Sequence, residues 1–276
     1  MATYFCVNSS LGQTWNSSNT VMWSTTSGLT SVPAGPPQAA DTATFDGASG
    51  GGTVTVGSSI NTTNTVSILT MGAFTGALDF SVNNISPTIG TMTNSGTATR
   101  TLNMGSGTWT ITGNTGNPWN FTTVTGLTLV SSLSTILLSA TAAGSRTLQF
   151  GGTTINNLSI SNPSRNNLQV RFADAVTVGG SLTISNVGNV RVDAALTVTG
   201  AWAFDGTSTN PAVLYLSAPT TFTVGAANTW TWIYVQNITK AGAGSITANN
   251  SFDGGSNTNI TINSPPSGGG GGIIGG

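Results

Sequence analysis

The residues best suited to bind a ligand are aromatic and lie near the C-terminal end. Trp230, Trp232 and Tyr234 occupy alternate positions. Because alternate residues of a β-strand point to the same face, this spacing predicts three rings on one face. An exposed row of rings can stack on the sugars of a host glycan, whereas a buried row fills a core, and the sequence leaves both open. Trp119 is a second candidate of the same kind.

Two arginines are the next candidates. Arg171 and Arg191 each stand between apolar residues, so both are expected to point outward, and Asp174 and Asp193 lie nearby. One interpretation is a small surface ladder of opposite charges, which contributes little to stability. The alternative is an interface or a contact with an anionic glycan.

Acid–base and metal chemistry have few candidate groups. The chain has no His and seven acidic residues. None of the acids is a Glu, and no two of them share a repeated motif. Hydrolysis of glycans needs a pair of carboxylates, and general acid–base catalysis needs a group with a suitable pKa. We therefore expect no catalytic residues, no metal site and no cofactor. The acids are Asp41, Asp46, Asp79, Asp174, Asp193, Asp205 and Asp253.

The composition limits the partners and the elements. Charged residues make up 5% of the 276 residues, and the net charge is −1 without a basic patch, which argues against nucleic acid. Cys6 is the single cysteine, so no internal disulfide is possible. Thr, Ser, Asn and Gly together form just over half of the chain, which favours strands and turns over helices. No apolar run is long enough to span a membrane, and the N-terminal residues lack the features of a signal peptide.

An internal repeat indicates how the strands are arranged. Residues 170–184 align with residues 190–204 without a gap, at an offset of 20, with matching apolar positions throughout. Residues 158–162 resemble residues 182–186 at an offset of 24. Residues 100–109 resemble residues 146–155 at an offset of 46, interpreted as two units of 23. Each unit carries short apolar–x–apolar pairs, and one unit cannot bury its own apolar face.

The repeat predicts an all-β fold, a parallel β-solenoid (β-helix) of about 20–24 residues per coil with three short strands in each coil. Nine or ten coils fit between residues 50 and 262. An antiparallel sandwich or barrel also has many short strands and is the alternative, but it does not require similar sequences in successive strands.

The ends of the chain differ from the repeats. Residues 1–50 are expected to form an N-terminal cap, in which Trp15, Trp23 and Phe45 cover the open edge of the solenoid at residues 51–262. Residues 263–276 form a Pro- and Gly-rich tail, which we expect to take part in assembly. The tail residues assigned to assembly are Gly268, Gly269, Gly270, Gly271, Gly272, Ile273 and Ile274.

Two segments carry a resemblance to known proteins. The tryptophan pair, the Gly/Pro loop at 32–37 and the segment DTATF at 41–45 resemble the opening of β-helical surface and adhesin repeat proteins. The segment TRTLNMGSGTWTITG at 99–113 is similar to β-helical proteins encoded in phage genomes. The resemblance implies a β-solenoid and is less specific for function.

We therefore expect a non-catalytic bacteriophage virion structural protein: a fibre, spike or capsid-decoration subunit that attaches to a host-surface glycan. Its expected partners are itself, as a homotrimer, and other virion proteins, with localisation in the virion. A cellular surface adhesin or extracellular filament subunit is the alternative. A glycan depolymerase and an ice-binding protein are less favoured, the latter because Thr-x-Thr pairs do not recur once per coil.

Overall fold

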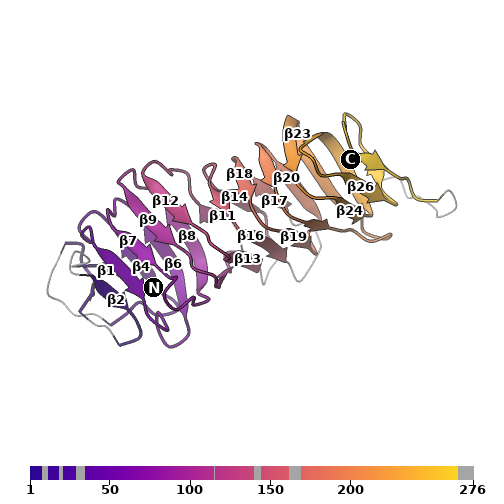
Figure 1. Cartoon of the computed structure of the whole chain (residues 1–276). Helices are drawn as coiled ribbons and strands as arrows, with labels where there is room; N and C mark the ends of the chain where they lie inside the picture. The colour runs from indigo at the N-terminus through magenta and orange to yellow at the C-terminus, as the bar shows by residue number, and fades with distance from the viewer. Residues whose placement is uncertain are drawn as a thin grey trace.

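The protein folds into an elongated β-solenoid. A computed structural model describes residues 1–7, 12–18, 21–28, 35–114, 116–139, 144–161 and 169–266. No helix occurs among these residues, and about eight parallel turns span residues 42–236. The strands stack along a rod with the first and the last described strands at opposite ends (Figure 1). The predicted fold class is confirmed.

Each regular coil contributes one strand to each of three faces, here named A, B and C. Face A contains the first parts of β6 (Thr65–Met71) and β8 (Thr88–Asn94), and β10 (Thr108–Ile111), β13 (Thr135–Ser139), β16 (Asn157–Ser161), β19 (Leu182–Ser185), β22 (Trp202–Phe204), β24 (Asn228–Thr231), β26 (Ile246–Asn249) and β28 (Thr261–Ile262). Face B contains β4 (Thr42–Phe45), the last parts of β6 and β8, β11 (Gly116–Asn120), β14 (Arg146–Gln149), β17 (Gln169–Phe172), β20 (Asn189–Val192), the first part of β23 (Ala212–Val224), the first part of β25 (Ile233–Ala241) and β27 (Phe252–Asp253). Face C contains β2 (Gln13–Trp15), β5 (Thr53–Val56), β7 (Ala77–Asp79), β9 (Arg100–Asn103), β12 (Leu127–Val130), β15 (Thr154–Ile155), β18 (Val176–Val178), β21 (Leu196–Val198) and the last parts of β23 and β25.

The residues that the gapless repeat aligns in the sequence are the residues that pair in the sheets. Val170 lies opposite Val190 on face B, Val176 opposite Leu196 on face C, and Leu182 opposite Trp202 on face A. Like residues of adjacent coils therefore stack directly. The predicted three strands per coil are confirmed by this register.

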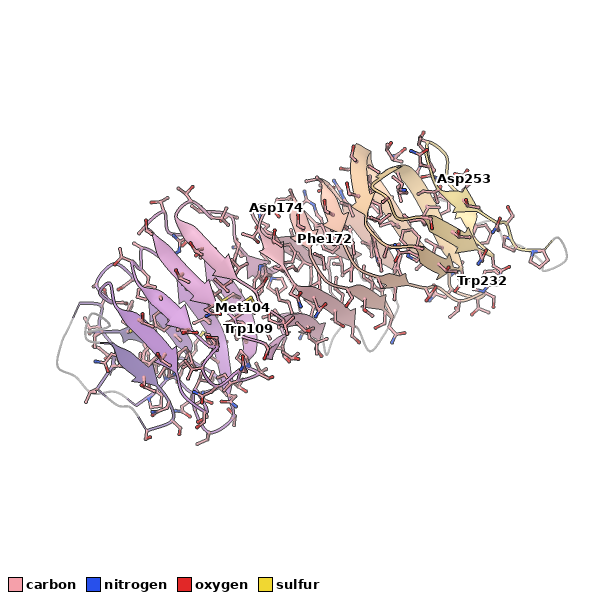
Figure 2. All side chains as sticks on the ribbon, in the orientation of Figure 1. Met104, Trp109, Phe172, Asp174, Trp232 and Asp253 are labelled. Carbon is pink, nitrogen blue, oxygen red and sulfur yellow. The ribbon has the colours of Figure 1, made fainter. Side chains whose placement is uncertain are left out.

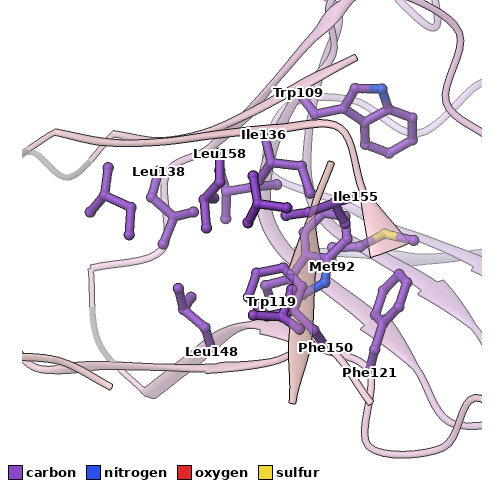
Figure 3. Packing of buried hydrophobic residues seen from close by; sticks show 14 of the residues in the cluster. Met92, Trp109, Trp119, Phe121, Ile136, Leu138, Leu148, Phe150, Ile155 and Leu158 are labelled. Atoms are coloured by element: carbon purple, nitrogen blue, oxygen red, sulfur yellow. The ribbon is translucent and has the colours of Figure 1, made fainter. Parts of the chain in front are cut away.

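The core is the stack of inward side chains. Strands such as β10 and β17 bury every second residue, because alternate side chains of a strand point to opposite faces. Aromatic rings pack along the axis, as Trp119, Phe150 and Phe172 do, with successive ring centroids 6.0 and 6.3 Å apart. Figure 3 shows Trp119 among Phe121, Phe150 and the aliphatic side chains of the same coils. This continuous apolar column ties the coils together.

The coils vary more in length than the repeat predicts. From Val170 to Val190 a coil takes 20 residues, but from Met92 to Trp119 it takes 27. Longer corners between strands consume the additional residues, so the chain makes about eight regular turns instead of nine or ten.

The similarity between residues 100–109 and 146–155 does not reflect stacking, so its interpretation as two units of 23 is wrong. Arg100 begins β9 on face C, whereas Arg146 begins β14 on face B. The actual partners of Arg146 are Gly116 and Val170. The two segments share a local pattern, with a buried arginine at the start of each strand, but occupy different corners of the coil.

The N-terminal segment adds three short strands and a cluster of aromatic rings to one end of the rod. β1 (Thr3–Cys6) pairs in parallel with β4 and in an antiparallel arrangement with β3 (Trp23–Ser24). The rings of Trp15 and Trp23 meet edge to face at 5.1 Å, and both pack on Phe45. All three are fully buried, as a cap requires. Cys6 lies in the same core, and desolvation, reinforced by the charge of Asp46, raises the pKa of its thiol to about 12.

The other end of the rod also finishes in edge strands. β27 pairs with β25, and β28 pairs with β26, each from one side only among the described residues. Phe252 in β27 is 38% exposed. The tail residues Gly268–Gly272, Ile273 and Ile274 lie outside the described residues, so their assignment to assembly stays a prediction.

Close contacts between the backbones of adjacent coils require glycine at some corners. A Cβ atom added to Gly96 would lie 1.7 Å from the carbonyl oxygen of Gly72 in the preceding coil. Real Cβ atoms never approach an oxygen so closely, so one of the two coils would have to move.

We therefore expect Gly96→Ala to destabilise the protein by at least about 1–3 kcal/mol, the usual cost of overpacking. Gly35→Ala is the matched control, because nothing lies within 4 Å of its added Cβ. Urea unfolding followed by fluorescence of the buried tryptophans measures the difference. Equal midpoints for the two variants would contradict the close packing at this corner.

Candidate binding surface

The predicted row of three aromatic rings does not form. Trp230 lies in β24 and is fully buried, with its Nε1 donating to the carbonyl of Trp202 at 3.1 Å. Its ring meets that of Trp202 edge to face at 5.0 Å. Trp230 is therefore a core residue, and its assignment to a binding surface is wrong.

A corner at Trp232 explains the error. Trp232 has a φ of 55°, so it ends β24 on face A, and β25 starts on face B. This left-handed conformation, uncommon for a bulky residue, interrupts the alternation that would have placed three rings together. Trp232 and Tyr234 are both partly exposed, and Figure 2 labels Trp232 at the C-terminal part of the rod.

Trp119 is also a core residue. It is fully buried in β11, and its ring stacks on Phe121 with centroids 4.7 Å apart. Its proposed exposure is therefore wrong as well. Of the four aromatic candidates, Trp232 and Tyr234 remain at the surface.

The outward arginines form the predicted ion pairs. Arg171 and Arg191 are direct partners in adjacent strands of face B. Their Nε atoms donate to the two carboxylate oxygens of Asp193, each at 2.5 Å. Burial alone would raise the pKa of Asp193, but hydrogen bonds from Arg191, Arg171 and Ser217 outweigh it and leave the pKa below its ordinary value.

Asp174 is not part of this cluster, contrary to the expectation. It accepts hydrogen bonds from the backbone N–H groups of Phe150 and Gly151, at 2.6 and 2.8 Å, in the preceding coil. Figure 2 labels Asp174 at the rim of the rod and Phe172 nearby. Asp174 therefore holds two coils together through a turn.

Tyr215 completes the cluster and was not identified from the sequence. It is the face B partner of Arg191 in the next coil. Its hydroxyl accepts a hydrogen bond from Gln169 Nε2 at 2.7 Å, so the ring reaches across two coils and lies beside Arg191. Extending the repeat alignment to residues 213–216 would have placed Tyr215 in this column.

We call the outward residues of four consecutive coils on face B the face B strip. Apart from Val213, its members are long or planar side chains, in contrast to the threonines and serines that line much of the outer surface, and all of them are partly exposed. They are Gln169 and Arg171, Asn189 and Arg191, Val213 and Tyr215, and Tyr234 and Gln236.

The other carboxylates serve turns. Asp205 accepts from the backbone and the hydroxyl of Thr231, at 2.8 and 2.9 Å, and Asp253 accepts from Gly255 and Asn257. Asp41, Asp46 and Asp79 accept comparable backbone or hydroxyl hydrogen bonds. In the described part of the chain, no three of the acidic and cysteine side chains come together as a metal site would require.

Threonine columns are more regular than the sequence suggests. On face C, Thr154, Thr177, Thr197 and Thr223 stack in four successive coils. This column consists of single threonines and leaves the expectation that Thr-x-Thr pairs do not recur once per coil unchanged. The next outward positions are Gly179, Thr199 and Gly225, so the column is one residue wide and does not form the Thr-x-Thr array weighed for ice binding.

No family model, no curated protein and no solved structure matches this chain. The described residues include no helix that is long and apolar enough to cross a membrane.

Two buried arginines give a matched pair for mutation. Arg100 donates to Asn94 Oδ1 at 2.8 Å and to the carbonyls of Ala98, Gly96, Thr125 and Thr123. Arg146 is equally buried, but its three guanidinium nitrogens have no hydrogen-bond partner in the described structure. Burial lowers the pKa of both groups.

We expect Arg100→Met to cost at least about 2 kcal/mol, because it leaves several buried acceptors without a donor. Arg146→Met should be within about 1 kcal/mol of the natural protein or more stable, because it removes an unpaired buried charge. Thermal and urea unfolding of both variants would measure this order. A larger loss for Arg146→Met would contradict it.

The ion pairs of Asp193 predict a dependence on pH and salt. Because its pKa is depressed in the folded protein, its contribution is present above the ordinary carboxyl pKa of about 3.9 and is lost as the pH falls through the folded-state value. Asp193→Asn should therefore destabilise the protein at neutral pH by no more than about 1 kcal/mol. The difference should shrink in acid and in high salt.

Asp253→Asn is the control, because Asp253 accepts neutral hydrogen bonds from Gly255 and Asn257. Its effect should not depend on salt. If salt leaves the cost of Asp193→Asn unchanged, the arginine pairs do not stabilise the fold.

Proposed function

We propose that this protein is a non-catalytic structural and attachment protein, a β-helical fibre, spike or decoration subunit of a bacteriophage virion. The observation that carries the proposal is the rod itself. About eight stacked turns share one apolar core, and β1 and β3 add an antiparallel pair at the N-terminal end. A rod of this kind can separate an attachment point from a particle without changing its shape.

The use of the carboxylates supports a role without catalysis. The acids described above bind turn backbones, hydroxyls or arginines, so each already has a structural task. Catalytic acids need a perturbed pKa and a free approach to substrate. The raised pKa of Cys6 also keeps its thiol protonated at neutral pH in a buried site.

The edge strands at the ends of the rod support assembly. Edge strands offer unpaired backbone groups to other chains, and proteins normally cover them. Among the described residues, β2 and β3 at the N-terminal end and β27 and β28 at the C-terminal end each have a neighbour on one side only. The homotrimer and the contacts with other virion proteins are proposals that place a partner at or near the C-terminal end.

The test is the mass of the full chain in solution beside that of a chain ending at Ser264, measured by light scattering. We expect the full chain to be a trimer or larger and the shortened chain to be a monomer. Circular dichroism of the shortened chain serves as the control for folding. If both chains are folded monomers of 27.7 kDa or slightly less, the self-assembling fibre is wrong.

A further inference from the structure

Among the described residues, the face B strip is the one place where outward cations gather. Of the six Lys and Arg residues, Arg100 and Arg146 are buried, and Arg165 lies outside the described residues. Lys240 donates to the carbonyls of Gly242 and Gly244. The remaining two, Arg171 and Arg191, are adjacent on face B and share one carboxylate.

Because the two arginines share one carboxylate, part of their positive charge is not neutralised and some of their N–H donors stay available. Two guanidinium groups face one carboxylate, so the cluster carries a local charge of +1 on a chain whose net charge is −1. Only Nε of Arg171 is engaged by the described residues, which leaves its two Nη atoms as donors at a side chain that is 41% exposed. Such paired nitrogens match the two oxygens of a carboxylate.

The cluster is held in place before any ligand binds. Asp193 fixes both guanidinium groups, and the Tyr215 hydroxyl is fixed by Gln169 Nε2 at 2.7 Å. Side chains that are already ordered lose less entropy on binding, which favours a specific site over adventitious contact.

From this arrangement we propose that the face B strip binds a carboxylate-bearing saccharide, with Arg171 and Arg191 pairing its acidic groups and the rings of Tyr215 and Tyr234 lying against its sugars. The proposal rests on the attachment function above and names its ligand class. Stacked strands place like side chains about 4.8 Å apart, close to the length of one sugar residue in an extended chain. Consecutive coils can therefore meet consecutive sugars.

The surroundings favour a saccharide over other anions. The strip offers amides from Gln169, Asn189 and Gln236 and phenols from Tyr215 and Tyr234, which match sugar hydroxyl groups. Nucleic acid needs many clustered cations, because its affinity comes from neutralised phosphates. Two arginines beside an aspartate do not supply them.

The experiment is calorimetric titration of the full-length protein at low salt with two acidic probes, a short oligogalacturonate and a sialylated oligosaccharide. The methyl ester of the same oligogalacturonate is the neutral control probe. We expect binding of at least one acidic probe, about tenfold or more weaker binding of the ester, and a loss of affinity in high salt. The probe that binds distinguishes a uronate from a sialoside.

Variants then locate the site. The double variant Arg171→Gln/Arg191→Gln should lose binding, and Tyr215→Phe, which keeps the ring, should weaken it. Lys240→Gln removes an outward cation elsewhere and should bind like the natural protein. Unfolding curves establish that each variant is folded.

Three results would overturn the proposal. The first is that neither acidic probe binds. The second is that the methyl ester binds as tightly as the oligogalacturonate. The third is that Lys240→Gln loses as much affinity for the probe as the double arginine variant. The result is independent of the light-scattering test. A monomer that binds a probe would support the saccharide site and contradict the self-assembling fibre. A trimer that binds neither probe would support the fibre and contradict the saccharide site.

Discussion

The register between coils is the constraint on which this structure depends. Parallel strands must stack residue on residue, so every coil has to place an apolar side chain where its neighbours do. Val170 over Val190, Leu158 over Leu182 and Leu182 over Trp202 all satisfy it. Because inward and outward residues alternate, the same register also fixes which polar side chains stack on the outside. The core and the candidate binding strip are therefore two consequences of one alignment.

Corners decide where this register starts and stops. Gly96 allows its coil to approach Gly72. The carbonyl of Gly96 also accepts a hydrogen bond from the buried guanidinium of Arg100. Trp232 turns the chain from face A to face B through a positive φ and so separates Trp230 in the core from Tyr234 outside. Where the corners lengthen, as between Met92 and Trp119, the coil takes more residues while the strands keep their partners.

The chain has few charged groups, and those among the described residues have defined positions. Most carboxylates bind the backbone of a turn, often between coils, as Asp174 does with Phe150 and Gly151. Asp193 instead bridges two arginines on the outer face, and Tyr215 of the following coil joins them. On a surface dominated by small hydroxyl side chains, this cluster differs in charge, shape and order. That difference is the reason to treat it as the candidate binding site.

The sequence by itself determined the solenoid, its three strands per coil and the outward direction of Arg171 and Arg191, because stacked coils repeat their apolar spacing and a gapless alignment is already a register. It also indicated that Trp15, Trp23 and Phe45 lie together at the N-terminal end, where all three are buried. Only the tertiary structure decided where the repeat misleads. Arg100 and Arg146 look equivalent but lie on different faces, and Trp230, Trp232 and Tyr234 look like one strand but cross a corner. Tyr215 lies beside the two arginines because its strand stacks on the strand of Arg191, and the spacing of these residues in the sequence does not show this. The physical reason is that alternation specifies direction within a strand, whereas a corner is set by backbone conformation and by contacts from neighbouring coils, which local spacing does not record.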